Sequence, residues 1–254
     1  MKMANGIHVK FEAMQDSRVF GCKPSFGFRR EQCRSGRVKW CNMTRAIWYF
    51  DVISPFAYLH LKLLHKLPAS LEIEYVPVLL AGLLKHWGHK GPAEIPAKRT
   101  YTYRYVTWLA GNLGIPFKMP PSHPFNSLAA LRLLIAAGPN PANVAVTFDM
   151  IWKEGRDLQN PEEIAELGRR LGIKDVQATL ADPGIKARLK TSTDVAISKG
   201  VFGVPTFLVD ETLFWGQESV DMMLTYLGNP KLFDTPEMRR LSKLPVGAAR
   251  HEVS

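Results

Sequence analysis

The segment "WYFDVISPFAYL", residues 48–59, decides the fold of this chain. It continues the apolar run that begins at 46, and such a run is typical of a strand covered on both faces. Ser54 is well suited to cap a following helix, and Pro55 takes the first helical position, where a missing N–H costs nothing. The segment therefore predicts a strand, a tight turn and a helix, with a lone serine at the turn.

The rest of the chain places helices inside a strand-containing unit. Residues 71–80, "LEIEYVPVLL", predict a second strand, which completes a strand–helix–strand unit of a parallel sheet. Residues 79–199 carry apolar positions at helical spacing, in successive segments. Strand patterns return at 204–210 and 213–216, and a last helix is expected at about 218–227. The order predicts an α/β protein split by an all-helical insertion.

The positive charge of the chain is concentrated at its N-terminus. Residues 1–42 hold +6 of the formal +10, and residues 43–254, the body of the chain, hold only +4. A mildly basic body does not favour a nucleic-acid partner. No apolar run approaches the ~18–20 residues of a membrane span, so we expect no membrane partner either.

The cysteines are as unevenly distributed as the charge. All three, Cys22, Cys33 and Cys41, lie within 1–42. The body therefore offers no disulfide, no thiol nucleophile and no cysteine ligand, and we expect no metal site. A cysteine-free body fits a cytoplasmic setting at least as well as a secreted one.

Both ends of the chain are expected to be irregular. Residues 1–42 show neither helical nor strand periodicity, and they lack the apolar stretch of a secretory signal. Residues 229–254 show no clear pattern. We predict an irregular N-terminal extension and an irregular C-terminal tail.

Ser54 by itself is most simply explained as a helix cap. No histidine is placed by the sequence to deprotonate it, which disfavours a Ser–His–acid triad. A helix N-terminus nevertheless favours a negative charge beside it, through its free N–H groups and its dipole. A hydroxyl there can donate a hydrogen bond to an anion and keep its own proton. Ser54 therefore suits the stabilisation of a thiolate or oxyanion that another molecule supplies.

Two later segments are ambiguous when taken alone. "GVFGVPTF", residues 200–207, reads as a glycine-rich turn into a strand, and only ~5–6% of X–Pro bonds in folded proteins are cis. "FWGQES", residues 214–219, reads as a strand end followed by a helix. The first N–H groups of that helix are either capped by its own side chains or free to hold a carboxylate.

Taken together and in this order, the three segments resemble the thioredoxin superfamily. The helix start that usually carries Cys-x-x-Cys is here Ser54-Pro55-Phe56-Ala57. The large helical insertion resembles that of the DsbA and kappa-class glutathione transferase branch. Within that branch, further segments resemble the 2-hydroxychromene-2-carboxylate isomerases over about 45–228: "PAEIPAKRTY", "LGIPF", "HPFNSLAALRLL", "TDVAISKGVFGVPTF" and "LFWGQESVDMML".

The resemblance implies a thioredoxin-like α/β domain, 43–78 and 200–228, with a helical insertion domain at 79–199. It also implies glutathione as a cofactor that is bound and returned, with Ser54 as the catalytic residue that stabilises its thiolate. The residues implied to hold glutathione are Val204 before a cis Pro205, which pair with its backbone, and Trp215, Gly216, Gln217 and Glu218 around its γ-glutamyl end. The family's last helix often starts Gly-x-Asp-Arg, so Gly216-Gln217-Glu218-Ser219 departs from the pattern.

The second substrate implied by the resemblance is a small aromatic carboxylate, in a protein that forms a homodimer. The reaction interconverts 2-hydroxychromene-2-carboxylate and trans-o-hydroxybenzylidenepyruvate in the catabolism of aromatic compounds. The substrate-binding residues are then Lys85, Pro96, Ala97 and Lys98, and Gly88-His89 replaces the family's Gly-Asn. The alternative for Lys85 is a solvated lysine at a helix end, and binding of the substrate carboxylate is the preferred interpretation.

Two other functions stay open from the sequence. One is a kappa-like glutathione transferase that conjugates electrophiles, and the other is a non-catalytic DsbA-like binding module. A thiol–disulfide oxidoreductase is not expected, because the body has no cysteine. The aromatic-rich segment "RTYTYRYVTW", residues 99–108, lines a pocket for a flat substrate in one interpretation and packs in the core in the other.

Overall fold

The computed structural model describes residues 28–31, 39–42 and 44–248 of the chain. Contacts divide the chain into two units, 1–42 and 43–254, each described by itself. In the first unit, β1 (Phe28–Glu31) and β2 (Lys39–Asn42) pair antiparallel. The prediction that this segment is irregular was wrong for these residues, because strands of four residues are too short to give a periodic signal.

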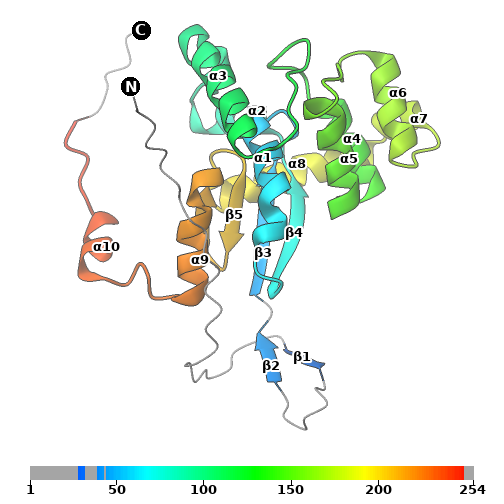
Figure 1. Cartoon of the computed structure of the whole chain (residues 1–254). Coiled ribbons are helices and arrows are strands. Elements are labelled where there is room, and N and C mark those ends of the chain that lie inside the picture. Colours follow the sequence, from blue (N-terminus) through cyan, green and yellow to red (C-terminus); the bar gives the residue numbers. More distant parts are fainter. Residues whose placement is uncertain (1–27, 32–38, 43, 249–254) are drawn as a thin grey trace, which may run out of the picture. The chain divides into compact units, whose positions relative to one another are not determined.

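A four-stranded mixed sheet organises the second unit, as Figure 1 shows. Its strand order is β4-β3-β5-β6, and the parallel pairing of β3 with β4 confirms the predicted strand–helix–strand unit. The later strand β5 runs antiparallel to both β3 and β6. The strands are β3 (Thr44–Phe50), β4 (Leu71–Pro77), β5 (Thr206–Val209) and β6 (Thr212–Trp215).

Seven helices lie between β4 and β5 in the chain. They are α2 (Leu80–Trp87), α3 (Pro96–Asn112), α4 (Leu128–Ala137), α5 (Pro141–Trp152), α6 (Pro161–Arg170), α7 (Val176–Ala181) and α8 (Pro183–Ser198). Helix α1 (Pro55–Leu63) joins β3 to β4, and α9 (Val220–Gly228) follows β6. Among the described residues, no helix combines the length and the apolar character that a membrane crossing requires.

Two short helices were not predicted. Helix α7 ends at Asp182, whose carboxylate accepts hydrogen bonds from Gly184 N and Ile185 N at the start of α8. Helix α10 (Pro236–Leu241) begins at Thr235, which caps Met238 N, and it corrects the prediction of an irregular C-terminal tail. Six residues make fewer than two turns, which is too short for an apolar stripe to be recognised.

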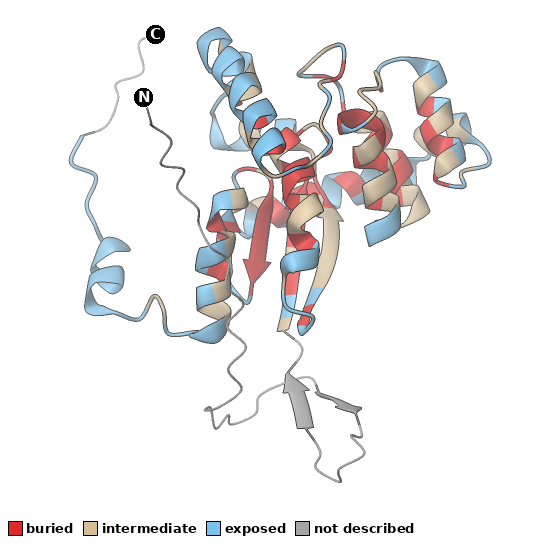
Figure 2. Ribbon diagram, in the orientation of Figure 1, coloured by how far each residue is buried: buried red, intermediate tan, exposed pale blue. Residues whose placement is uncertain are grey.

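The core joins the helical insertion to the central strand of the sheet. Trp48 and Phe50 of β3 stack at 4.6 Å, and Phe148 of α5 lies 5.7 Å from the Phe50 ring. These rings are fully buried, and Figure 2 shows the buried residues gathered where the helices meet the sheet. Trp152 of α5 donates to Val52 O at 2.9 Å, directly after β3. Because each buried aromatic side chain contributes roughly 1.5–3 kcal/mol, this cluster fixes α5 against the strand that leads to Ser54.

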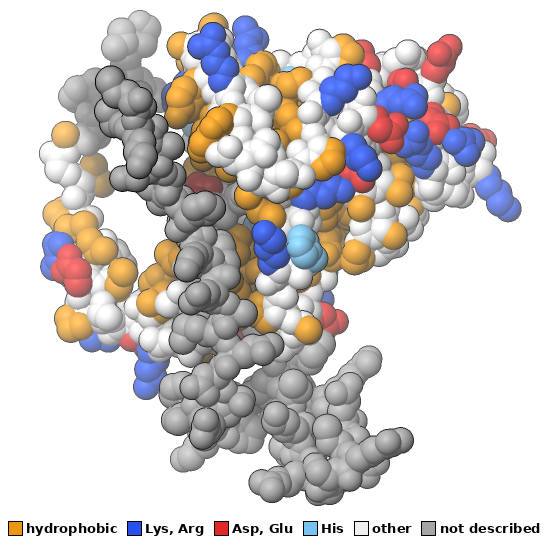
Figure 3. All heavy atoms as spheres, in the orientation of Figure 1, with side chains coloured by type: hydrophobic (Ala, Val, Ile, Leu, Met, Phe, Trp, Pro, Cys, Tyr) orange, Lys and Arg blue, Asp and Glu red, His pale blue; other side chains and the backbone are white. Residues whose placement is uncertain are grey.

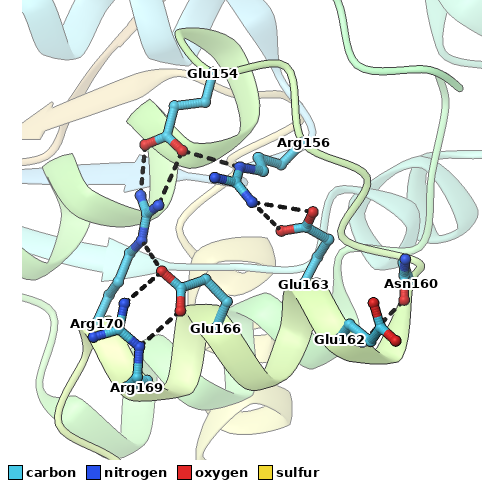
Figure 4. Close-up of polar contacts among 8 residues, drawn as sticks. All are labelled: Glu154, Arg156, Asn160, Glu162, Glu163, Glu166, Arg169 and Arg170. Carbon is cyan, nitrogen blue, oxygen red and sulfur yellow. Dashed lines mark hydrogen bonds and ion pairs between the residues drawn. The ribbon is translucent and has the colours of Figure 1, made fainter.

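Charged side chains connect the end of α5 to α6, as Figure 4 shows. Arg170 binds both Glu154 and Glu166, and Arg156 binds both Glu154 and Glu163. The Arg170 guanidinium lowers the pKa of the Glu154 carboxyl, mainly through the hydrogen bond. All five side chains are partly exposed, so the network orients α6 and adds little to stability.

A close approach between α6 and α7 predicts a clear difference between two glycine substitutions. A Cβ at Gly168 would lie 2.2 Å from Val176 Cγ2, whereas a Cβ at Gly111 of α3 would meet nothing within 4 Å. We expect Gly168→Ala to destabilise the protein by ~1–3 kcal/mol through overpacking. Gly111→Ala should stabilise it by roughly 0.5–1 kcal/mol through helix propensity. Urea unfolding of both variants checks this, and equal effects would contradict the packing of α7 on α6.

Candidate functional site

Ser54 caps α1 as the sequence predicted. Its Oγ accepts a hydrogen bond from Ala57 N at 3.2 Å, and Pro55 takes the first helical position. The side chain is largely buried, with 7% of the residue exposed. The N–H of Phe56, in the same first turn, has no acceptor among the described residues. The first turn of α1 thus keeps a free N–H and a hydroxyl proton close to each other.

The segment after α8 lies opposite this turn. The Ser54 hydroxyl faces Val204 O across 3.5 Å, although the two residues are 150 positions apart. The Val204–Pro205 peptide bond is cis, as the resemblance implied. The half-buried Val204 also keeps an N–H without an acceptor among the described residues. The Val204 carbonyl thus accepts only the long contact from the Ser54 hydroxyl, and the Val204 N–H is open, as at the free edge of a strand.

The turn after β6 adjoins this segment through the backbone. Gly216 N donates to Pro205 O at 2.9 Å. The Trp215 ring covers Gly203, where a Cβ would lie 2.7 Å from Trp215 Nε1. Glu218 folds its carboxylate back over Gly216, where a Cβ would lie 2.6 Å from Oε1. Residues 200–207 and 214–219, whose roles were ambiguous from the sequence, thus form one continuous surface.

Gln217 carries an unpaired polar atom in this turn. Its Oε1 is buried and has no hydrogen-bond partner among the described residues. A buried amide oxygen without a donor costs roughly 1–3 kcal/mol. A ligand that brings an N–H donor to this turn would remove that cost.

The substrate-binding residues implied by the resemblance lie on two other helices. Lys85 is exposed in the last turn of α2, and Pro96, Ala97 and Lys98 are exposed in the first turn of α3. None of the four forms a hydrogen bond or ion pair with Ser54 within the described part of the chain. Their role in substrate binding therefore stays a prediction.

Asp51, for which the sequence predicted no role, is central in the structure. Its carboxylate accepts from Leu80 N at 2.8 Å, from Ile53 N at 3.1 Å and from Ser127 Oγ at 3.2 Å. Asp51 is fully buried, and desolvation raises its pKa to about 6, against the lowering effect of the Leu80 and Ile53 N–H donors. The signal in the sequence was an acid directly after the apolar run 46–50, because a buried carboxylate needs hydrogen-bond partners.

His123 is a second residue that the sequence analysis missed. Its Nε2 lies 2.9 Å from Ile53 O, and the Tyr103 hydroxyl lies 2.9 Å from its Nδ1. Burial lowers its pKa. His123 and Ile53 are 70 positions apart in the sequence, and no local sequence pattern predicts a contact over that separation.

Neither the buried His60 nor the half-buried His123 forms a triad with Ser54. His123 binds the carbonyl of Ile53, and His60 accepts from Trp48 Nε1 at 3.3 Å in the core. Burial lowers the pKa of His60 to about 4, so its imidazole is neutral near pH 7. His60 therefore packs in the core, and among the described residues Ser54 has no general base beside it.

A cavity of about 430 Å³ lies elsewhere, between β3, β4 and α8. Its lining includes Tyr49, Val76 and Arg188, and none of the residues around Ser54. The groups that could bind an anionic ligand lie at the Ser54 turn and not in this cavity, because the helix end and the free backbone N–H groups are at the turn. We therefore place the candidate site at Ser54, Val204 and the turn after β6.

Comparison with known families and sequences identifies the family of this chain. Residues 46–228 match the profile of the family described as "DSBA-like thioredoxin domain". The 2-hydroxychromene-2-carboxylate isomerase of Pseudomonas putida is 30% identical over 192 residues, 71% of this chain and 93% of that protein. Glutathione S-transferase kappa 1 of Homo sapiens is 25% identical over 201 residues, 71% of this chain and 89% of that protein.

Solved structures confirm the predicted fold class. A 2-hydroxychromene-2-carboxylate isomerase structure superposes with a TM-score of 0.65 at 25% identity, covering 80% of this chain and all 100% of that one. A probable DsbA oxidoreductase of Streptomyces coelicolor gives a TM-score of 0.56 at 18% identity, covering 73% and 91%. The protein has a thioredoxin-like fold with a mixed sheet and a large helical insertion.

The raised pKa of Asp51 predicts how Asp51→Asn changes stability with pH. The folded-state pKa of about 6 exceeds the ordinary 3.8, so the contribution of Asp51 is fully present below pH 3.8 and is lost as pH rises through 6. The wild-type minus variant difference in unfolding free energy should fall by ~2 kcal/mol between about pH 4 and about pH 7. Urea unfolding across this range measures it. A constant difference would mean that Asp51 stays ionised throughout.

Proposed function

The chain belongs to the DSBA-like thioredoxin domain family, in the branch of the 2-hydroxychromene-2-carboxylate isomerases, and we propose that it is a glutathione-dependent isomerase. One observation carries the proposal. The Ser54 hydroxyl stands at the capped start of α1, 3.5 Å from the backbone carbonyl of Val204, which precedes a cis proline. A serine in this position can stabilise the thiolate of a bound thiol, and the body of the chain has no thiol of its own.

The unpaired groups of the site fit glutathione. The free N–H of Val204 suits the peptide backbone of the tripeptide, as in strand pairing. The buried Oε1 of Gln217 suits an ammonium donor, and the γ-glutamyl end of glutathione carries one. The exposed Glu218 carboxylate, which takes the place of the family's aspartate, adds a negative charge for the same ammonium.

Bound glutathione supplies a nucleophilic thiolate that is recovered when the product leaves. Ser54 Oγ accepts from Ala57 N, so its one proton is free to turn from the distant Val204 O to a sulfur. The free N–H of Phe56 and the dipole of α1 favour the same negative charge. A thiol pKa that falls by one unit corresponds to ~1.4 kcal/mol of preferential thiolate stabilisation, which these groups can provide.

The second substrate is proposed to be 2-hydroxychromene-2-carboxylate or its partner trans-o-hydroxybenzylidenepyruvate. Their interconversion requires temporary loss of a double bond and rotation, with no net oxidation. Lys85 and Lys98 are exposed cations that form no ion pair within the described part of the chain. We assign them to the substrate carboxylate, with Pro96 and Ala97 shaping the first turn of α3 beside it.

Conjugation of glutathione to an electrophile is the second candidate, because relatives of this chain are kappa glutathione S-transferases. It uses the same thiolate site, but it consumes glutathione. A non-catalytic binding module is the third candidate. In that case Ser54 is only a helix cap, and its substitution has no turnover to reduce.

Variants of Ser54 separate the thiolate role from the cap role. Ser54→Ala loses both the cap, worth roughly 0.5–2 kcal/mol of stability, and the donor. Ser54→Asp keeps a cap acceptor but cannot donate to a sulfur and adds a negative charge. We expect both variants to lose the ultraviolet band of bound glutathione thiolate at neutral pH, and only Ser54→Ala to lose stability. Calorimetry and difference spectra on the same samples measure this. Retention of the band in Ser54→Asp would contradict the thiolate role.

Product analysis separates isomerisation from conjugation. With 2-hydroxychromene-2-carboxylate, we expect turnover that requires glutathione and leaves its total concentration unchanged. The expected product is trans-o-hydroxybenzylidenepyruvate, identified by chromatography with thiol titration in parallel. Stoichiometric loss of glutathione would favour the transferase. An absence of both glutathione binding and turnover would leave the binding module.

A further inference from the structure

Three aromatic rings lie along the exposed side of α3. Tyr101, Tyr105 and Trp108 are 69%, 40% and 59% exposed. Their rings stack in sequence, with Tyr101 and Tyr105 6.1 Å apart and Tyr105 and Trp108 6.0 Å apart. The spacing i, i+4, i+7 places them on one face of the helix. We call these three residues the aromatic ladder.

The ladder is not part of the core. Helix α3 packs inward through Val106 and Ala110, which are 0% and 1% exposed. Of the two interpretations of residues 99–108, core packing therefore fails for the three ladder rings. Figure 3 shows hydrophobic and basic side chains together on this region of the surface. A contiguous exposed apolar group with charged neighbours is typical of a binding surface.

The ladder is continuous with the Ser54 turn. Phe56, two residues after Ser54 in the first turn of α1, lies 6.1 Å from the Tyr105 ring. The aromatic surface therefore begins beside the hydroxyl proposed to hold the thiolate. A planar ligand that stacks on the ladder is brought next to that site.

The charge of α3 specifies the kind of ligand. The helix carries Lys98, Arg99 and Arg104 and no acidic residue. None of the three forms an ion pair with another described residue. Arg104 lies three residues from Tyr101 and four from Trp108, and these spacings make the residues neighbours on the helix surface. Stacking rings with unpaired cations complement a planar aromatic anion.

We propose that the aromatic ladder binds the planar aromatic part of a carboxylate substrate, with Arg104 joining Lys85 and Lys98 in attracting its carboxylate. The inference rests on the proposed function and adds the residues that recognise the flat aromatic part of its anionic substrate. Aliphatic acids of similar size bind less well, because they cannot stack on the rings. The ladder residues determine affinity and specificity for this substrate and do not hold glutathione.

The test uses 2-naphthoate as the probe and cyclohexanecarboxylate as the non-aromatic control. Calorimetry measures binding of each to the full chain and to Tyr105→Leu and Tyr105→Phe. Tyr105 is the central ring, and Tyr105→Phe keeps the ring without the hydroxyl. Glutathione is titrated into the same three proteins. Circular dichroism confirms that each variant is folded, and sedimentation gives its oligomeric state.

We expect Tyr105→Leu to weaken 2-naphthoate binding about five- to tenfold and Tyr105→Phe to keep it, with glutathione affinity unchanged. Equal affinity of wild type for the two acids, or equal 2-naphthoate affinity of wild type and Tyr105→Leu, would overturn the proposal. A dimer that dissociates in Tyr105→Leu, with unchanged 2-naphthoate binding, would assign the ladder to a second copy of the chain. If 2-naphthoate binds through the ladder but glutathione does not bind, the proposed function fails and the aromatic-anion site stands.

Discussion

The buried carboxylate of Asp51 is the contact on which the geometry of the site depends. It joins three segments that are far apart in the chain: the turn after β3, the start of α2 through Leu80 N, and the start of α4 through Ser127 Oγ. Each donor would otherwise be a buried or terminal polar group without a partner. Because Ser54 N donates to Asp51 O, the same residue also fixes the entry of the chain into α1.

The sheet brings the second half of the site to this turn. Antiparallel pairing places Thr206 opposite Tyr49, so Val204 and Pro205 continue past the end of β3 toward Ser54. The backbone of Pro205 then holds the turn after β6 through Gly216 N. The helical insertion leaves the sheet after β4 and returns before β5 without disturbing this register, since its helices pack on the core around Trp48 and Phe148.

The proposed stabilisation of a ligand's thiolate follows from the groups that the Ser54 turn has and from those that it lacks. Among the described residues, no thiol lies in this turn and no histidine binds Ser54, and the turn keeps a hydroxyl proton, free N–H groups and a helix dipole. Such a set favours an anion that a ligand supplies, and it gives no means of generating a nucleophile from the serine itself. The aromatic ladder is suited to a second ligand in the same way, because its rings and the unpaired cations of α3 favour a flat anion.

The sequence by itself determined the elements whose signals are local. The apolar run before Asp51, the Ser54-Pro55 helix start and the strand patterns at 204–216 predicted the sheet, the capped α1 and the helical insertion. Their order identified the thioredoxin-like fold. Only the tertiary structure decided the roles of Asp51 and His123 and the exposure of the ladder, because these depend on contacts 29 to 76 positions away. Periodicity reports which face of an element is apolar, but it does not report which distant donor meets a carboxylate or whether an aromatic face is left uncovered.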